Sequence, residues 1–174
     1  MNILDLKKLY KNAKLVPGEG PLPCELLLIG EAPGEKEDKE RRPFVGDCGE
    51  LINEILNATK LPRRKVRITN AVKQRPPKNR KPTFEEILAH RSFLMQEIKE
   101  CEPRAIILLG KTAAQAFFKE EELEPIWRLR KKLFYNGSQR IFVTYHPGAA
   151  LRSDSNKELL KKDIERVVHF LKEV

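Results

Sequence analysis

The stretch Glu25-Leu26-Leu27-Leu28-Ile29, followed by Gly30-Glu31-Ala32-Pro33-Gly34, decides how this sequence folds. Its first half is a short, continuous apolar run, which is typical of a strand buried in a parallel sheet. Its second half holds two glycines and a proline, and so predicts a tight turn directly after the strand. In open α/β sheets ligands bind outside the carboxyl ends of the strands. We therefore expect Glu31 in the mouth of a cleft, where a carboxylate can handle water or stabilise positive charge.

Helical and strand patterns alternate along the rest of the chain, which favours a layered α/β domain with a mainly parallel sheet. Further strands are expected at 66–72 and 105–109, with a hairpin at 132–144 whose turn is Asn136-Gly137. Helices are expected at 3–11, 47–59, 84–100, 111–118 and 157–174, the third of them opened by a capping box that begins at Thr83. No boundary is evident, so residues 1–174 are interpreted as a single domain.

Composition favours a nucleic-acid partner, although a soluble charged surface would give the same numbers. The net charge is +9, with 34 basic and 25 acidic residues, and such an excess favours polyanions. Charged residues make up 34% of the chain, which suits the ion-pair networks of a thermophile. There is neither a transmembrane run of ~18 apolar residues nor a signal peptide, so a cytoplasmic protein is expected.

The cysteines Cys24, Cys48 and Cys101 are far apart and form no C-x-x-C pair, so no metal site is expected from them. Buried free thiols are the first interpretation. Cys24 and Cys101 each precede a strand-like run, however, and a disulfide across the strand starts stays open.

Three further side chains stand where a flat, hydrogen-bonding ring could be bound. Phe44, between Pro43 and Val45, is either an exposed stacking platform worth ~1–3 kcal/mol or an ordinary core residue. Asn70 lies late in its strand, and its carboxamide, with one acceptor and two donors, could pair with the edge of such a ring, or else it satisfies a strand end. His146 follows the hairpin, where an imidazole can donate to a base that departs with negative charge.

Two segments predict contacts with DNA. The basic, proline-stiffened stretch 73–81 forms either a phosphate rail or a solvated charge run. After His146, small residues lead to Leu151, which either wedges into the base stack or packs inward. The candidate DNA-contacting residues are Lys73, Arg75, Lys78, Arg80, Leu151 and Arg152.

Two other features carry no predicted function. Gly110-Lys111-Thr112 resembles the end of a P-loop, but Ala105 stands where that loop needs glycine, so nucleotide binding is rejected. His90 and His169 lie within helical patterns and are interpreted as packing or surface residues.

The segments Gly30–Gly34, Arg42–Gly46, Asn70 with Arg75-Pro76-Pro77, and His146–Leu151, in this order, resemble the uracil-DNA glycosylase superfamily, specifically its thermostable family 4 branch. The resemblance implies a three-layer α/β/α sandwich with a central, mainly parallel four-stranded sheet. It also implies an enzyme of base-excision repair that flips uracil out of DNA, hydrolyses its N-glycosidic bond with water and leaves an abasic site.

The resemblance also assigns roles to single residues. Ala32 stands in the base-binding turn where another branch places a catalytic aspartate, so Glu31 would handle the water. Phe44 would stack on uracil, Asn70 would read its edge, and His146 would stabilise the leaving anion. Glu37 would crowd the C5 face and exclude the methyl group of thymine.

One departure from the family concerns its cofactor. The family looks built around an iron–sulphur cluster held by four cysteines, and the corresponding positions here are Ile3, Leu6, Gln74 and Ala89. Because none of these is a thiolate, we expect no cluster, with apolar packing from Ile3 and Leu6 in its place.

Two alternatives remain open at this point. The pocket could select hypoxanthine or xanthine, with Ala32 or Glu37 deciding, or the chain could be a catalytically silent, DNA-binding damage sensor. No lysine obviously stands beside Glu31 for a lyase step, although Lys36 and Lys39 are near in sequence, so a monofunctional enzyme is expected. The expected partner is DNA that contains deaminated bases, bound by a monomer.

Overall fold

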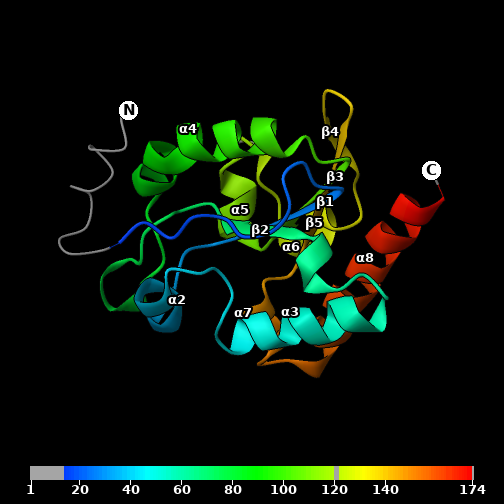
Figure 1. The fold of residues 1–174 in the computed structure, drawn as a ribbon, viewed down its shortest axis with the longest axis horizontal. Helices are drawn as coiled ribbons and strands as arrows, with labels where there is room; N and C mark the ends of the chain where they lie inside the picture. Colours follow the sequence, from blue (N-terminus) through cyan, green and yellow to red (C-terminus); the bar gives the residue numbers. More distant parts are fainter. Residues whose placement is uncertain (1–13, 120–121, 174) are drawn as a thin grey trace.

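The computed structural model describes residues 14–119 and 122–173, built around a five-stranded sheet in the order β2-β1-β3-β5-β4 (Figure 1). The strands are β1 (Leu26–Gly30), β2 (Arg67–Asn70), β3 (Ala105–Leu109), β4 (Phe134–Asn136) and β5 (Gln139–Thr144). All neighbours pair in parallel except β4 and β5, which are antiparallel. The mainly parallel α/β architecture is therefore confirmed, and the strand beyond the expected four is β4, the first arm of the hairpin.

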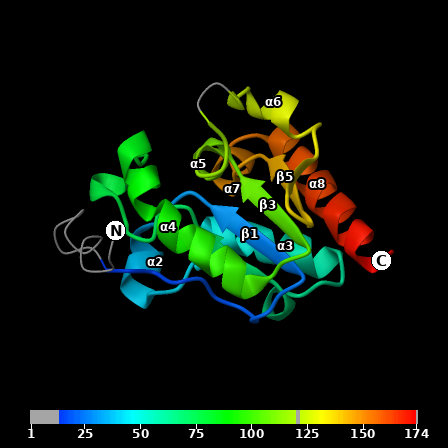
Figure 2. The same ribbon diagram turned by 90° about the horizontal axis from the view of Figure 1, so that it is seen from above.

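Helices cover both faces of the sheet and complete a three-layer sandwich. They are α2 (Glu35–Glu40), α3 (Asp47–Ala58), α4 (Phe84–Cys101), α5 (Lys111–Gln115), α6 (Ile126–Leu129), α7 (Pro147–Ala150) and α8 (Asp154–Lys172), with two 3₁₀ turns, η1 (Arg63–Lys65) and η2 (Pro77–Asn79). In Figure 2, α4 and α3 lie on opposite sides of β1. The helix expected at 3–11 lies outside the described residues, as do Ile3 and Leu6.

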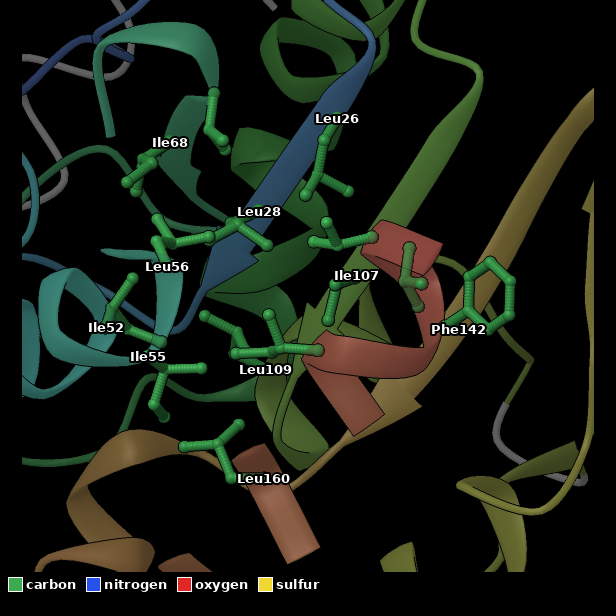
Figure 3. Packing of buried hydrophobic residues seen from close by; sticks show 14 of the residues in the cluster. Leu26, Leu28, Ile52, Ile55, Leu56, Ile68, Ile107, Leu109, Phe142 and Leu160 are labelled. Atoms are coloured by element: carbon green, nitrogen blue, oxygen red, sulfur yellow. The ribbon is translucent and has the colours of Figure 1, made fainter. Parts of the chain in front are cut away.

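Strand β1 contributes to the core on both faces of the sheet. All of its residues are buried, and successive side chains point to opposite faces. Leu26 and Leu28 belong to one buried cluster with Ile52 of α3 and Leu160 of α8 (Figure 3). On the other face, Leu27 and Ile29 join a cluster that includes Ile87, Leu94 and Ile98 of α4. The apolar run that predicted a buried strand is thus the centre of the sandwich.

Local signals explain where the long helices begin. Thr83 caps α4 as expected: its Oγ1 accepts from the Glu86 N–H, while the Glu86 carboxylate accepts from the Thr83 N–H at 2.8 Å. The last helix begins at Asp154 rather than Lys157, because the Ser153 hydroxyl accepts from the Asn156 N–H.

Strand β2 lies at the edge of the sheet and is partly covered there. Glu19 and Ile68 exchange two backbone hydrogen bonds of 2.9 and 2.8 Å in an isolated antiparallel bridge. From α4, the Glu97 carboxylate accepts from Arg67, Thr69 and Lys73. These contacts hold the edge strand that ends in Asn70.

Cys24, Cys48 and Cys101 are free thiols. Cys24 and Cys101 are buried next to each other at the amino end of β1, where the Cys24 N–H donates to the Cys101 carbonyl at 2.8 Å. Within the described residues, no helix is long and apolar enough to cross a membrane.

The two other histidines stand where the sequence predicted, one in the core and one at the surface. His90 is fully buried and its Nδ1 accepts from the Lys73 N–H at 3.1 Å. His169 is exposed and pairs with Glu173 at 2.9 Å.

Candidate active site

A cavity of about 460 Å³ opens at the carboxyl edge of the sheet, where β1, β2 and β5 end. Parallel strands bring their carboxyl ends to one edge, which explains why residues so distant in sequence meet here. The cavity is lined by Glu31, Ala32, Pro33, Gly34, Glu37, Phe44, Cys48, Asn70, Pro76, Asn79, Arg80, His146 and Arg152. Every residue predicted to be catalytic or to bind a base is in this lining.

Glu31 is held in a defined position at the end of β1. Its backbone carbonyl accepts from the Val72 N–H at 3.0 Å, which ties the turn to the segment after β2. Its side-chain Oε2 accepts from the Thr112 hydroxyl at 2.5 Å. The Glu31 carboxylate is therefore held by a specific side-chain contact.

His146 caps the short helix α7, and its Nδ1 accepts from the Gly148 N–H at 3.0 Å. This bond assigns the proton of the neutral imidazole to Nε2, which is then a donor. Burial lowers the pKa of His146, an effect that the nearby Glu31 carboxylate opposes. The site therefore favours a neutral imidazole that offers one N–H to a ligand.

Phe44 differs from the exposed platform that the sequence suggested. The side chain is buried, with only 5% exposed, and its ring lies 6.5 Å from the His146 ring between centroids. Gly30 permits this packing, because a Cβ at that position would collide with the Phe44 ring and lie 2.5 Å from the Asn70 Oδ1. Phe44 is thus a wall of the cavity rather than a side chain on the surface.

Hydrogen bonds with the side chains of Glu37 and Arg63 hold the loop that carries Phe44. Glu37 accepts from the N–H groups of Val45 at 3.0 Å and Gly46 at 2.9 Å, and its other oxygen accepts from the Gly34 N–H at 3.2 Å. Arg63 donates to the carbonyls of Pro43 and Phe44. Glu37 therefore joins the two loops that form this side of the cavity, in addition to the C5-face role expected of it.

Asn70 ends β2 and is buried, with 3% of the residue exposed. No hydrogen bond joins its carboxamide to another residue in the described part of the chain, although a buried polar group normally has such a partner. The Ala71 N–H donates to the Gly30 carbonyl at 2.9 Å and fixes the backbone beside it. A carboxamide placed in this way is ready to pair with a ligand in the cavity.

Of the four basic residues predicted between 73 and 81, Lys73 is placed differently from the expectation. It is buried, and its Nζ pairs with Glu97 at 2.6 Å and Thr69 at 2.5 Å. Burial lowers the pKa of Lys73, and the Glu97 carboxylate counters the effect. The prediction that Lys73 contacts phosphate is therefore wrong, because its ammonium points into the protein.

Of the remaining DNA-contact candidates, two line the cavity and three are next in sequence to residues that line it. Arg75 donates to Asn79 at 2.6 Å, Lys78 is exposed, and Arg80 lines the cavity while pairing with Glu86. Leu151, after α7, is 49% exposed, which contradicts the inward-packing alternative. Arg152 beside it is exposed and lines the cavity.

Gly110-Lys111-Thr112 forms no phosphate cradle. Gly110 takes a φ of +88°, and a Cβ there would lie 2.8 Å from the His146 Cβ, so the turn needs glycine in order to pack on His146. Thr112 directs its hydroxyl to Glu31. Thr112 and Arg63 thus contact residues of the candidate site. Neither lies in a sequence pattern that predicts such a contact.

The positions that correspond to cluster ligands do not fit an iron–sulphur cluster where they are described. Gln74 is fully buried and Ala89 is half-buried, and neither offers a thiolate. Across residues 14–119 and 122–173, no group of three or more His, Cys, Asp or Glu side chains could hold a metal ion.

Comparison with known proteins gives consistent similarities. The model of the "Uracil DNA glycosylase superfamily" matches residues 17–172. A "Type-4 uracil-DNA glycosylase" of Saccharolobus solfataricus is 42% identical over 173 residues, which cover 95% of this chain and 79% of that protein. A protein of the same name from Thermotoga maritima is 40% identical over 161 residues, covering 91% and 83%. A "Type-5 uracil-DNA glycosylase" of Pyrobaculum aerophilum is 30% identical over 147 residues, covering 76% and 65%.

Proposed function

The chain belongs to the uracil DNA glycosylase superfamily, and on that premise we propose that it is a monofunctional DNA glycosylase that removes uracil in base-excision repair. The observation that carries the proposal is one cavity lined by a neutral imidazole, a held carboxylate and a carboxamide that has no hydrogen-bond partner among the described residues. These groups belong to His146, Glu31 and Asn70. They are what a site needs to select a base and to break its bond to a sugar.

Selection of the base is assigned to Asn70. Its carboxamide has an acceptor for the N3–H of uracil and a donor for O4, whereas cytosine exchanges donor and acceptor at that edge. A cytosine in the cavity would leave the buried amide facing groups of like kind, which is costly. Phe44 offers its ring to the face of the same base.

Bond cleavage is assigned to Glu31 and His146. As the N-glycosidic bond breaks, its electron pair leaves with the base, and the His146 Nε2–H donates to O2 where negative charge builds. The Glu31 carboxylate stabilises the positive charge left on the sugar and orients a water toward C1′. The water oxygen bonds to C1′, its proton passes to the carboxylate, and an abasic site remains.

The surface around the cavity is assigned to DNA. Arg75, Lys78, Arg80 and Arg152 would contact phosphates, and the exposed Leu151 would enter the space that a flipped nucleotide leaves in the stack. We further propose that the protein acts as a monomer in the cytoplasm on DNA with deaminated bases. We also propose that it works without an iron–sulphur cluster, which the side chains of Gln74 and Ala89 support.

The test uses identical oligonucleotides that contain uracil, hypoxanthine, xanthine or normal bases, followed by alkaline cleavage of abasic sites. We expect cleavage at uracil, and a loss of about tenfold or more in each of Glu31→Ala, Asn70→Ala and His146→Ala. Cleavage only at hypoxanthine or xanthine would replace uracil as the substrate. No cleavage of any oligonucleotide by a folded, DNA-binding protein would overturn the enzyme and leave a binding module. Iron analysis of the same preparation tests the cofactor.

A further inference from the structure

The hydroxyl of Thr112 bridges two loops that end different strands. Thr112 is in α5, after β3, and Glu31 follows β1; the two residues are 81 positions apart in sequence. The Thr112 Oγ1 donates to the Glu31 Oε2 at 2.5 Å, and Thr112 is 6% exposed. A hydrogen bond from a buried hydroxyl to a carboxylate is stronger than one between neutral groups.

The local structure gives the hydroxyl no other role. The cap of α5 is Gly110, and no side chain caps that helix. Thr112 makes no other side-chain hydrogen bond within the described residues, and its neighbours Ala113 and Ala114 pack in the apolar core. An apolar side chain of the same shape would fit this position, so the polar atom is explained by Glu31 alone.

Glu31 stands between two cavities. It lines the base cavity of about 460 Å³ and also an adjoining cavity of about 630 Å³, which is lined by Gly110, Thr112 and His146 among others. Thr112 lines only the second cavity. Open space on both sides leaves the carboxylate room to turn, so a specific contact is needed to fix its direction. The Thr112 bond occupies Oε2, while Oε1 has no hydrogen bond to any described residue.

We propose that Thr112 is a positioning residue, which holds the Oε2 of Glu31 so that Oε1 is the oxygen that meets the attacking water. This inference rests on the proposed glycosylase function. It assigns no chemical step to Thr112, which does not line the base cavity. Its contribution is geometric: a carboxylate displaced by about 1 Å can lose on the order of a hundredfold in rate.

The first test compares Thr112→Val, which keeps the shape and removes the hydroxyl, with Thr112→Ser, which keeps the hydroxyl. Steady-state cleavage of a uracil oligonucleotide over a range of substrate concentrations gives kcat and KM separately. We expect Thr112→Val to lower kcat by about 10- to 100-fold with KM unchanged, and Thr112→Ser to recover most of the loss. The same substitution in a Glu31→Ala background should change the rate no further.

Thr144→Val is the matched control. Thr144 is also buried and donates to a carboxylate, that of Asp163 at 2.7 Å, and it does not line the base cavity. We expect it to lower the melting temperature without lowering kcat. Thermal unfolding of all variants separates misfolding from loss of the contact.

The possible results distinguish this inference from the proposed function. A folded wild type that cleaves no uracil overturns both, because the function on which the inference rests is then absent. An active wild type with an equally active Thr112→Val overturns the inference alone. Equal losses in Thr112→Val and Thr112→Ser, or a higher KM with unchanged kcat, also overturn it.

Discussion

Arg63 holds the backbone of Phe44, because its Nη1 donates to the Phe44 carbonyl oxygen at 2.6 Å. Phe44 lines the cavity, whereas Arg63 does not. Phe44 needs such support because its φ of +53° lies in the left-handed region, which costs a non-glycine residue about 1–2 kcal/mol. The position of the ring therefore depends on a guanidinium that a substrate base would not touch.

Removal of the Arg63 side chain should weaken substrate binding. We expect Arg63→Ala to raise the KM for a uracil oligonucleotide by about tenfold, because the Phe44 loop loses two hydrogen bonds to a charged donor. Arg64→Ala is the control, since the neighbouring Arg64 is exposed. Equal KM values in the two variants would contradict the support of Phe44 by Arg63.

Glu37→Gln should destabilise the folded protein. Both carboxylate oxygens of Glu37 accept backbone N–H groups, and an amide nitrogen in place of either oxygen would face a donor. We expect the free energy of unfolding to fall by about 1–3 kcal/mol in urea denaturation. The exposed Glu40, in the same helix, serves as the control through Glu40→Gln, which should change stability little. A stable Glu37→Gln variant would show that the loop is held by other contacts.

The cleavage rate should begin to fall at a lower pH than it would with a histidine of ordinary pKa. Because burial lowers the pKa of His146, the imidazole stays neutral below its usual value of ~6.5. We expect the single-turnover rate to hold as the pH falls through 6.5 and to drop only at lower pH. In His146→Gln, whose amide does not titrate, the acid limb due to this group should be absent. A rate that already falls above pH 6.5 in the wild type alone would contradict the neutral imidazole.

His90 should make stability depend on pH. Burial and the charge of Lys73 lower the pKa of His90 to about 4. The unfolded chain protonates this residue at a pH of ~6.5, so between these values the unfolded state binds more protons and the free energy of unfolding falls as pH falls. Over this pH range the free energy of unfolding should fall by about 3 kcal/mol because of His90. Urea denaturation of His90→Gln should lack this part of the pH dependence, whereas the exposed His169→Gln should keep it.

Salt dependence of DNA binding should separate Lys78 from Lys73. Each phosphate contact contributes about −0.9 to the slope of log K against log salt concentration. Lys78 is exposed, so Lys78→Met should make the slope shallower by about one unit. Lys73→Met should leave the slope unchanged, because its ammonium is buried on Glu97. A shallower slope in Lys73→Met would restore Lys73 to the phosphate contacts.

The sequence alone was enough to predict the site residues that directly follow strands. It was not enough to predict the residues that hold those site residues in place. Glu31 and His146 stand beside glycine or proline at the end of apolar runs, so their meeting at one sheet edge could be predicted. Arg63 and Thr112 act through contacts 19 and 81 residues away in sequence, and nothing local to them indicates such partners. The same limit explains Lys73, which lies in a basic stretch while its partner Glu97 is in α4.

The fold could be predicted to a similar extent. Continuous apolar runs and the capping box located the central strands and α4, because burial and caps leave strong local patterns. The short helices α2, α6 and α7 contain four to six residues, too few for a hydrophobic period to appear. The cavity wall formed by Phe44 depended on tertiary hydrogen bonds and on the missing side chain of Gly30.

The covered edge of β2 bears on how the candidate site responds to heating. An edge strand has one neighbour and is ordinarily where a sheet frays or recruits a foreign strand. In this protein Glu19 forms a backbone bridge to the free edge of β2, the strand that ends in Asn70. Glu97 also accepts hydrogen bonds from three side chains in and after that strand. If Asn70 selects the base as proposed, discrimination between bases should persist on warming until the whole domain unfolds, because the strand that carries Asn70 does not fray first.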